Sequence, residues 1–270
     1  MHASDKWLIC LKTQKTPEAE PPSDKIVEIE AREIFVQPHL EITVDEYKTL
    51  KVSDGAVNTH IKHVTGHQVE TQLQQSVPPS GDRTDIIGAI ENNLDVLPNV
   101  YEGGLKIWEC SIDLTHYLFK LPRTCLAGKN LGCGAGLPGI AAYLQGASHV
   151  HFQDYRCRFF CGDWGGVERV LQQDTAGEGG HGYDVILTSE TIYSTDSYLK
   201  LHQIMRELLK PTGIIYLAAK TYYFGVGGGT RSFEDLVRQE DVFSSKVIQE
   251  FADGVQREIL QLQFKDQGTS

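Results

Sequence analysis

The sequence predicts an α/β fold in which a mostly parallel sheet is flanked by helices. From about Tyr101 onward, short apolar runs alternate with amphipathic segments, which is the pattern of buried strands joined by helices. Within this part, the stretch KNLGCGAGLPGI (Lys129 to Ile140) has the glycine content of a tight turn between a strand and a helix. At 270 residues, the chain is long enough for one such domain with an appendage.

The individual elements follow from the same pattern. Short apolar or alternating runs predict strands, and apolar residues at intervals of three and four predict helices. The predicted strands are Ser148 to Asp154, Arg158 to Cys161, Asp184 to Ser189, Gly213 to Lys220, Phe243 to Phe251 and Val255 to Phe264. The predicted helices are Leu137 to Leu144, Asp196 to Leu209 and Ser232 to Gln239.

Residues 1–95 differ in composition from the rest. The stretches TPEAEPPSD and SVPPSGDRTD are rich in helix and strand breakers, and only IVEIEAREIFV and LEITVDEY alternate as strands do. We therefore expect residues 1–95 to be a partly disordered or accessory region and residues 96–270 to be the main domain. The spacing of His60, His63 and His67 could place three imidazoles on one helical face as metal ligands. Because no cysteine or carboxylate lies nearby, a solvated surface without metal is favoured.

Composition limits the partners. The formal net charge of -11, without a long basic run, argues against direct nucleic-acid binding and suits a basic protein partner. The six cysteines lack C-x-x-C spacing, so we expect reduced thiols in the cytosol or nucleus. No apolar run approaches the roughly 18 residues that a membrane span needs, so no membrane association is expected.

The glycine turn fits two ligand templates. Gly132, Gly134 and Gly136 match the G-x-G-x-G turn of S-adenosylmethionine enzymes, whereas Gly134, Gly136 and Gly139 match the G-x-G-x-x-G of a dinucleotide site. In both, an acid after the second strand binds the ribose, and Asp154 has that position. A plain strand-to-helix turn remains a third interpretation. A nicotinamide-dependent enzyme is therefore an alternative at this point.

Three further segments favour the first template. They are YEGGLKIWEC (Tyr101 to Cys110), GDW (Gly162 to Trp164) and LTSETIY (Leu187 to Tyr193), followed by AAKTYYFGVGGG. With these segments the chain, over about Asp95 to Lys265, resembles the histidine protein methyltransferases, which are related to the family-16 lysine methyltransferases. The resemblance implies a Rossmann-like seven-strand methyltransferase sheet and S-adenosylmethionine as cofactor. It also implies methyl transfer to a histidine of a large-subunit ribosomal protein, by a monomer in the nucleus (including the nucleolus) and cytoplasm.

The resemblance also assigns roles to residues. It implies that Asp154 binds the ribose, that Trp164 stacks on the adenine and that Asp163 accepts from its amino group. It places Glu190 and Tyr193 at the reacting groups, where Glu190 could fix the imidazole tautomer or take its proton and Tyr193 could orient the acceptor. The implied cofactor-binding residues are Ile107, Trp108, Glu109, Cys110, Ser111, Gly132, Gly134, Gly136, Gln153, Asp154, Tyr155, Gly162, Asp163, Trp164 and Ser189.

The chain departs from this family in two places. Where the family has an apolar strand ending in an acid, V-L-D-L-G-C-G, this chain has Gly128-Lys129-Asn130-Leu131, so we expect the first, central strand to be shortened and nearly missing. After Tyr155 the next strand follows at once, although parallel neighbours need a crossover of about a dozen residues. Strands two and three therefore cannot both occupy their usual places.

These departures make a second interpretation necessary. We expect weakened or absent cofactor binding, and the alternative function is a catalytically impaired variant isoform that acts as a protein-binding module. The segment Gly227-Gly228-Gly229 is equally compatible with a flexible loop without chemistry and with a lid that faces the substrate.

Overall fold

The computed structural model describes the core of the expected domain and parts of the N-terminal region. The residues it describes are 32–33, 48–55, 58–63, 65, 67–68, 71, 107–133, 136–153, 160–161 and 182–266. Among the described helices, none is both long and apolar enough to cross a membrane.

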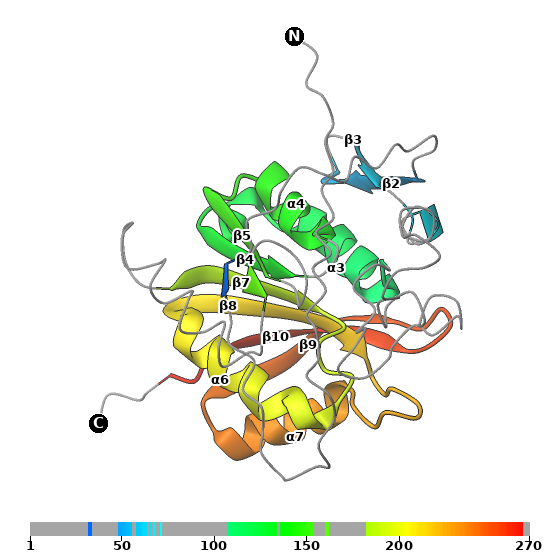
Figure 1. Ribbon diagram of the computed structural model, residues 1–270. Helices are drawn as coiled ribbons and strands as arrows, with labels where there is room; N and C mark the ends of the chain where they lie inside the picture. The colour runs from blue at the N-terminus through cyan, green and yellow to red at the C-terminus, as the bar shows by residue number, and fades with distance from the viewer. Residues whose placement is uncertain are drawn as a thin grey trace.

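A six-strand sheet with the order β5-β4-β7-β8-β10-β9 forms the centre of the molecule (Figure 1). The strands are β4 (Lys129–Cys133), β5 (His149–Gln153), β7 (Tyr183–Ser189), β8 (Leu209–Lys220), β9 (Phe243–Phe251) and β10 (Arg257–Phe264). The first four are parallel to one another, and β10 runs antiparallel to both β8 and β9. Successive strands are added on one side of β4 (β5) and then on its other side (β7 and β8), and this reversal of strand order between β4 and β7 confirms the Rossmann-like α/β fold.

Helices cover both faces of the sheet, which gives three layers (Figure 1). Helices α3 (Glu109–Lys120) and α4 (Leu137–Leu144) lie on one face, and α6 (Tyr198–Leu208) and α7 (Thr230–Glu240) lie on the other. Short 3₁₀ turns at Arg123–Leu126 and Thr195–Ser197 precede β4 and α6.

Strand β7 has apolar side chains on both faces of the sheet, and helices bury both faces. Val185 and Leu187 point into the core beneath α3 and α4, whereas Ile186 points into the core beneath α6 and α7. A strand buried on both faces is apolar at successive positions rather than at alternate ones, as YDVILTS is. This accounts for the continuous apolar run that predicted the strand.

The central strand β4 forms over five residues, so it is short, as expected, but the expectation that it is nearly missing was wrong. It pairs in parallel with β5 on one side and β7 on the other. The Asp184 carboxylate accepts from the Lys129 N–H at 2.8 Å, and the buried Asn130 amide donates to the carbonyls of Leu126 and Gly128. A Cβ on Gly128 would collide with the Asp184 carboxylate, so glycine is required for this contact. Side-chain hydrogen bonds thus replace the missing residues of a longer strand.

The third expected strand lies outside the main sheet. β6 (Phe160–Cys161) pairs antiparallel with β1 (Arg32–Glu33) in a separate two-strand sheet. The sheet of the described residues therefore has six strands rather than seven, and the place beside β5 is not taken by β6. This agrees with the expectation that strands two and three cannot both keep their usual places when no crossover joins them.

The N-terminal region contributes a hairpin that the sequence did not predict. Strands β2 (Lys48–Ser53) and β3 (Asn58–His63) pair antiparallel, and Val52 and Ile61 are buried in the same core as Leu114 of α3. The hairpin therefore covers part of α3 (Figure 1).

The histidine cluster does not form the helical face that its spacing allowed. His60 and His63 belong to strand β3, where residues three positions apart point to opposite faces. In the part of the chain that the structure describes, no group of three or more metal-ligating side chains gathers.

Candidate functional site

The predicted site residues that the structure describes lie at or near one edge of the sheet. The parallel strands β4, β5, β7 and β8 all end there, and the chain leaves β4 and β7 toward opposite faces through α4 and α6. In open α/β sheets the crevice at this switch point is where ligands bind. A ligand bound in this crevice would therefore contact the residues that end or follow these strands.

The glycine turn after β4 brings strand and helix close together. Gly132 is buried in β4, and a Cβ there would lie 3.2 Å from the Cα of Gly139 in α4. Gly136 caps α4 with a φ of 84°, a left-handed conformation that glycine adopts at little cost. Among the described residues, no side chain caps this helix end. Glycine at 132 and 136 thus permits the close backbone approach that a cofactor needs.

The segment before the turn lies at the start of α3. Trp108 is the extended residue that precedes the helix, and Glu109 begins it with its side chain exposed. Cys110 is fully buried and Ser111 almost so, which places the first turn of α3 against the sheet. Ile107 is half-buried just ahead of Trp108. Helix α3 itself was not predicted, because this segment was interpreted only as a cofactor contact.

A strained turn follows β7. Glu190 has a φ of 57°, one of two non-glycine residues with positive φ in the described chain. Its N–H donates to the Ala218 carbonyl at 3.0 Å, and the hydroxyls of Thr188 and Thr191 bond each other across the turn at 2.7 Å. Such a conformation costs about 1–3 kcal/mol and persists where surrounding contacts require it, often at functional sites. Ser189, the last residue of β7, is buried below it.

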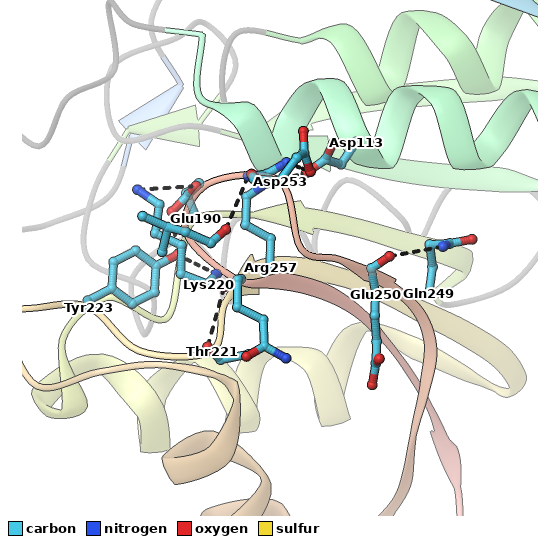
Figure 2. Close-up of polar contacts among 11 residues, drawn as sticks. Asp113, Glu190, Lys220, Thr221, Tyr223, Gln249, Glu250, Asp253 and Arg257 are labelled. Carbon is cyan, nitrogen blue, oxygen red and sulfur yellow. Dashed lines mark hydrogen bonds and ion pairs between the residues drawn. The ribbon is translucent and has the colours of Figure 1, made fainter.

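The Glu190 carboxylate is buried and only partly satisfied. Its side chain is 8% exposed, and its Oε2 accepts a hydrogen bond from the Tyr223 hydroxyl (Figure 2). Within the described residues its Oε1 accepts no hydrogen bond, and the Lys220 Nζ lies 3.9 Å from it. One oxygen of a buried acid is therefore available to a ligand.

Lys220, at the end of β8, lies between aromatic rings. Its Nζ is 5.1 Å from the centroid of the Trp108 ring and 5.5 Å from that of Tyr223. The Tyr223 ring in turn meets the Tyr193 ring edge-on, with centroids 6.4 Å apart. The structure thus joins the segments after β7 and β8 with the start of α3 around one lysine.

The protonation of the neighbours can be assigned from their surroundings. Burial, followed by the negative charge of Glu190, raises the pKa of the Tyr223 phenol far above its usual range. Burial and then Glu190 likewise raise the pKa of the Cys110 thiol. Both groups stay protonated at neutral pH, so Tyr223 is a hydrogen-bond donor and Cys110 is not a thiolate nucleophile.

The loop from Thr221 to Gly229 is attached to the turn after β7. The Gly228 N–H donates to the Tyr193 carbonyl at 3.1 Å, and the Tyr223 N–H donates to the Gly228 carbonyl at 2.9 Å. The buried Tyr198 hydroxyl accepts from the Gly229 N–H at 2.7 Å. A Cβ on Gly228 would collide with the carbonyls of Ile192 and Tyr193. The base of the glycine segment is thus packed, and it holds Tyr223 beside Glu190.

A second polar cluster fastens α3 to the antiparallel part of the sheet. The buried Arg257 guanidinium pairs with Asp113 of α3 at 2.6 Å and with Asp253 at 3.0 Å (Figure 2). The Thr221 N–H donates to the Gln256 carbonyl at 3.0 Å, which joins the end of β8 to the turn before β10. These contacts fix the start of α3, and with it Trp108, relative to Lys220.

The structure brings together only part of the predicted site. Cys110 lies beside the Glu190 carboxylate, Trp108 contacts Lys220 and Tyr193 contacts Tyr223 in the same cluster, and Gly132 and Gly136 belong to the turn after β4. Gln153 ends β5 at the same edge, and only its backbone is described. The predicted residues outside the described part are Gly134, Asp154, Tyr155, Gly162, Asp163 and Trp164.

Sequence reasoning missed Lys220 and Tyr223. A signal was present, because the apolar run of β8 ends in a lysine followed by two tyrosines, at the edge where parallel strands carry functional residues. The signal could not show that these side chains reach a carboxylate that is 30 residues earlier in the chain, because loop packing decides that contact.

Comparison with known proteins finds several histidine protein methyltransferase 1 homologs. A histidine protein methyltransferase 1 homolog from Dictyostelium discoideum is 40% identical over 194 residues, which cover 62% of this chain and 60% of the relative. The Bos taurus homolog is 36% identical over 76% of this chain and 66% of the relative. The Rattus norvegicus homolog is 30% identical over 93% of this chain and 77% of the relative. The chain thus spans between 60% and 77% of these relatives.

The comparisons with family models and with solved structures do not assign a family to this chain. No family model matches the chain. The magnesium protoporphyrin IX methyltransferase from Synechocystis, whose crystal structure has bound SAM, is 13% identical, covers 57% of this chain and 78% of its own, and superimposes with a TM-score of 0.39. At this level the superposition supports no statement about a ligand. The family assignment rests on the curated relatives. Since the rat relative matches nearly the whole chain, the chain belongs to the family of the histidine protein methyltransferase 1 homologs.

Proposed function

We propose that this chain is a protein-histidine N-methyltransferase that uses S-adenosylmethionine and acts on a histidine of a basic protein, a large-subunit ribosomal protein. The observation that carries the proposal is the buried Glu190 carboxylate, which lies at the carboxyl edge of the sheet with Oε1 unbonded among the described residues. The family membership of the chain supports the same activity.

The described part of the site fits the cofactor. Glycine at 132 and 136 permits close backbone approach, and Trp108 and Ser189 lie near the same edge. Bound there, S-adenosylmethionine supplies a methyl group on a positively charged sulfur, which an unprotonated imidazole nitrogen takes directly. The reaction then needs positioning more than a strong base.

Glu190 is the residue we assign to the acceptor. Its Oε1 would accept the N–H of the target imidazole, which leaves the lone pair of the other ring nitrogen free to react. Because Tyr223 already binds Oε2, the carboxylate cannot rotate freely, and the imidazole is oriented with it. After transfer the ring is cationic, and its N–H proton passes through Glu190 to solvent. Tyr193, edge-on to Tyr223, would line the position of the ring.

The charge of the chain suits this substrate. A net charge of -11 favours encounter with a basic protein, and it disfavours direct contact with nucleic acid. We propose a monomer that works in the nucleus, including the nucleolus, and in the cytoplasm, where ribosomal proteins are assembled and used.

The test combines cofactor binding with methyl transfer. S-adenosylhomocysteine is titrated calorimetrically into the wild-type chain and the Glu190→Gln variant, and both are then assayed with labelled S-adenosylmethionine on proteins extracted from the large ribosomal subunit. We expect both chains to bind within threefold of each other, because Gln keeps the shape of the side chain. We expect Glu190→Gln to lower labelling of histidine by about 10² to 10⁴, the usual contribution of an acid–base residue.

The two outcomes that contradict the proposal are different in kind. Wild-type labelling by Glu190→Gln would remove the role of this residue. A folded chain that binds the ribosomal proteins but neither cofactor nor methyl label would support the second candidate function, a non-catalytic protein-binding variant. The observation that favours this candidate is the position of β6, which pairs with β1 instead of extending the main sheet beyond β5.

A further inference from the structure

Three side chains enclose the ammonium of Lys220. Trp108 and Tyr223 present ring faces to its Nζ at 5.1 Å and 5.5 Å from their centroids, and the Glu190 Oε1 lies 3.9 Å away. The lysine side chain is 18% exposed and that of Glu190 is 8% exposed. Aromatic faces attract cations through their quadrupole, and a buried carboxylate adds a full negative charge. The enclosure is therefore built to hold a positive charge.

The contacts of the Lys220 ammonium indicate which other cations could bind in its place. At 3.9 Å the ion pair is too long for a hydrogen bond, and the two ring contacts are cation–π contacts. Among the described residues, the ammonium is thus held by charge and by ring faces rather than by directed hydrogen bonds. A cation without N–H groups, such as a sulfonium, could make the same charge and ring contacts as the ammonium.

We propose that Trp108, Tyr223 and Glu190 form a cation subsite, which the ammonium of Lys220 occupies and from which a ligand sulfonium displaces it. The subsite adjoins the oxygen that we assign to the acceptor imidazole, so donor and acceptor meet at Glu190. Lys220 then acts as a specificity-determining residue, because only the charged methyl donor, and not the uncharged thioether product, competes with it. The identity of the sulfonium rests on the proposed function, whereas the cation subsite itself does not.

The first experiment measures binding rather than activity. Calorimetric dissociation constants for S-adenosylmethionine and S-adenosylhomocysteine are determined for the full chain and for Lys220→Met at pH 8. We expect Lys220→Met to bind S-adenosylmethionine about tenfold more tightly while its affinity for S-adenosylhomocysteine changes less than about threefold. The physical reason is that the sulfonium no longer has to displace an ammonium.

Two variants serve as controls. Lys220→Arg keeps a cation in the enclosure and is expected to retain the wild-type ratio of the two dissociation constants. Lys246→Met removes the same charge from an exposed position on β9 and is expected to change neither constant. An unchanged ratio in Lys220→Met, or a selective loss of S-adenosylmethionine binding, would overturn the proposal.

A second measurement decides the matter even if the chain binds neither cofactor form, which would count against the proposed function alone. Trimethylsulfonium chloride is titrated into chains with ¹⁵N-labelled tryptophan, and the indole N–H signal of Trp108, assigned by its loss in Trp108→Phe, is followed. We expect a saturable shift in Lys220→Met and, at the same concentrations, a shift at least fivefold smaller in the wild type. No shift in a folded Lys220→Met chain would refute the cation subsite.

Discussion

At the scale of single residues, the site depends on how each buried charge is balanced. Glu190 is balanced by a tyrosine donor on one oxygen and by a lysine beside the other, and it is held in a left-handed conformation by its own N–H. Burying a charged group without such partners would cost several kcal/mol. The contacts from Tyr223 and Lys220 therefore explain how a carboxylate can stay buried at this edge.

Asp184 gives a pH-dependent prediction at the same scale. Burial alone would raise the pKa of its carboxyl, but the hydrogen bonds from the Lys210 ammonium and the Lys129 N–H outweigh burial and leave the pKa below its ordinary value. The unfolded chain, with an Asp pKa of about 3.9, takes up the proton first as pH falls. The stabilisation is thus complete above about pH 4 and is lost as pH falls through the lower, folded pKa.

The measurement is urea unfolding of wild type and Asp184→Asn from pH 7 to pH 3. We expect the variant to have the lower free energy of unfolding at neutral pH and the difference to shrink below about pH 4. Asp235→Asn, which loses only an exposed pair with Arg238, is the control and is expected to differ little from wild type at any pH. A difference for Asp184→Asn that stays constant down to pH 3 would contradict the account of β4.

At the scale of elements, the loop Thr221–Gly229 positions Tyr223. Its base is buried and bonded to the turn after β7, whereas its tip exposes Phe224 and Val226. The sequence left two expectations for Gly227-Gly228-Gly229, a flexible loop and a lid. Gly228 and Gly229 are packed against the carbonyls of neighbouring segments, so the base of this segment is not a free loop. The lid stays a prediction. An element that carries a site residue needs such attachment to keep that residue in place.

A pair of glycine variants tests this attachment. Gly228→Ala introduces a Cβ that collides with the carbonyls of Ile192 and Tyr193, and we expect it to lower the free energy of unfolding by about 1–3 kcal/mol. Gly225 has a φ of 81° with open space around it, so Gly225→Ala has only the backbone cost of about 1 kcal/mol. Urea unfolding of both variants is the measurement, and equal costs would mean that the base of the loop is not packed as described.

At the scale of the whole molecule, the N-terminal hairpin shares the core of the main domain. Ile61 is 6% exposed and belongs to the same cluster as Leu114 and Leu118 of α3. Because Trp108 precedes α3, the packing of the hairpin against α3 also helps to hold Trp108 in place. The boundary that composition predicts at residue 95 can thus be tested through the stability of the sheet.

We expect Ile61→Ala to destabilise the whole domain in one transition, by about 2–5 kcal/mol, as for other large-to-small changes in a core. The measurement is thermal or urea unfolding followed by near-ultraviolet circular dichroism. Lys62→Ala, exposed on the same strand, is the control and is expected to change the stability by less than about 0.5 kcal/mol. An unchanged main transition for Ile61→Ala would mean that the hairpin folds as a separate accessory unit.

Elements with a strong local pattern were predicted closely. Helix α4 and strand β9 have the bounds expected from periodicity, and β7 and β8 differ only at their starts. Other elements were missed, because their sequence pattern is weak or was interpreted differently. Strand β4 looked too short and too interrupted, and α3 was interpreted only as a cofactor segment. The stability of β4 comes from the distant Asp184 carboxylate and from the local hydrogen bonds of Asn130, and that of α3 comes from its buried face, which packs against distant parts of the chain.

By itself the sequence determined the α/β class and the strand-to-helix turn with glycine at 132 and 136. These depend on residue type and spacing along a short stretch, which sequence records directly. Only the tertiary structure decided that β4 forms, that β6 leaves the main sheet, and that Lys220 and Tyr223 surround Glu190. The physical reason is that each of these outcomes depends on segments that are 30 or more residues apart in the sequence and meet only when the sheet and its loops are packed.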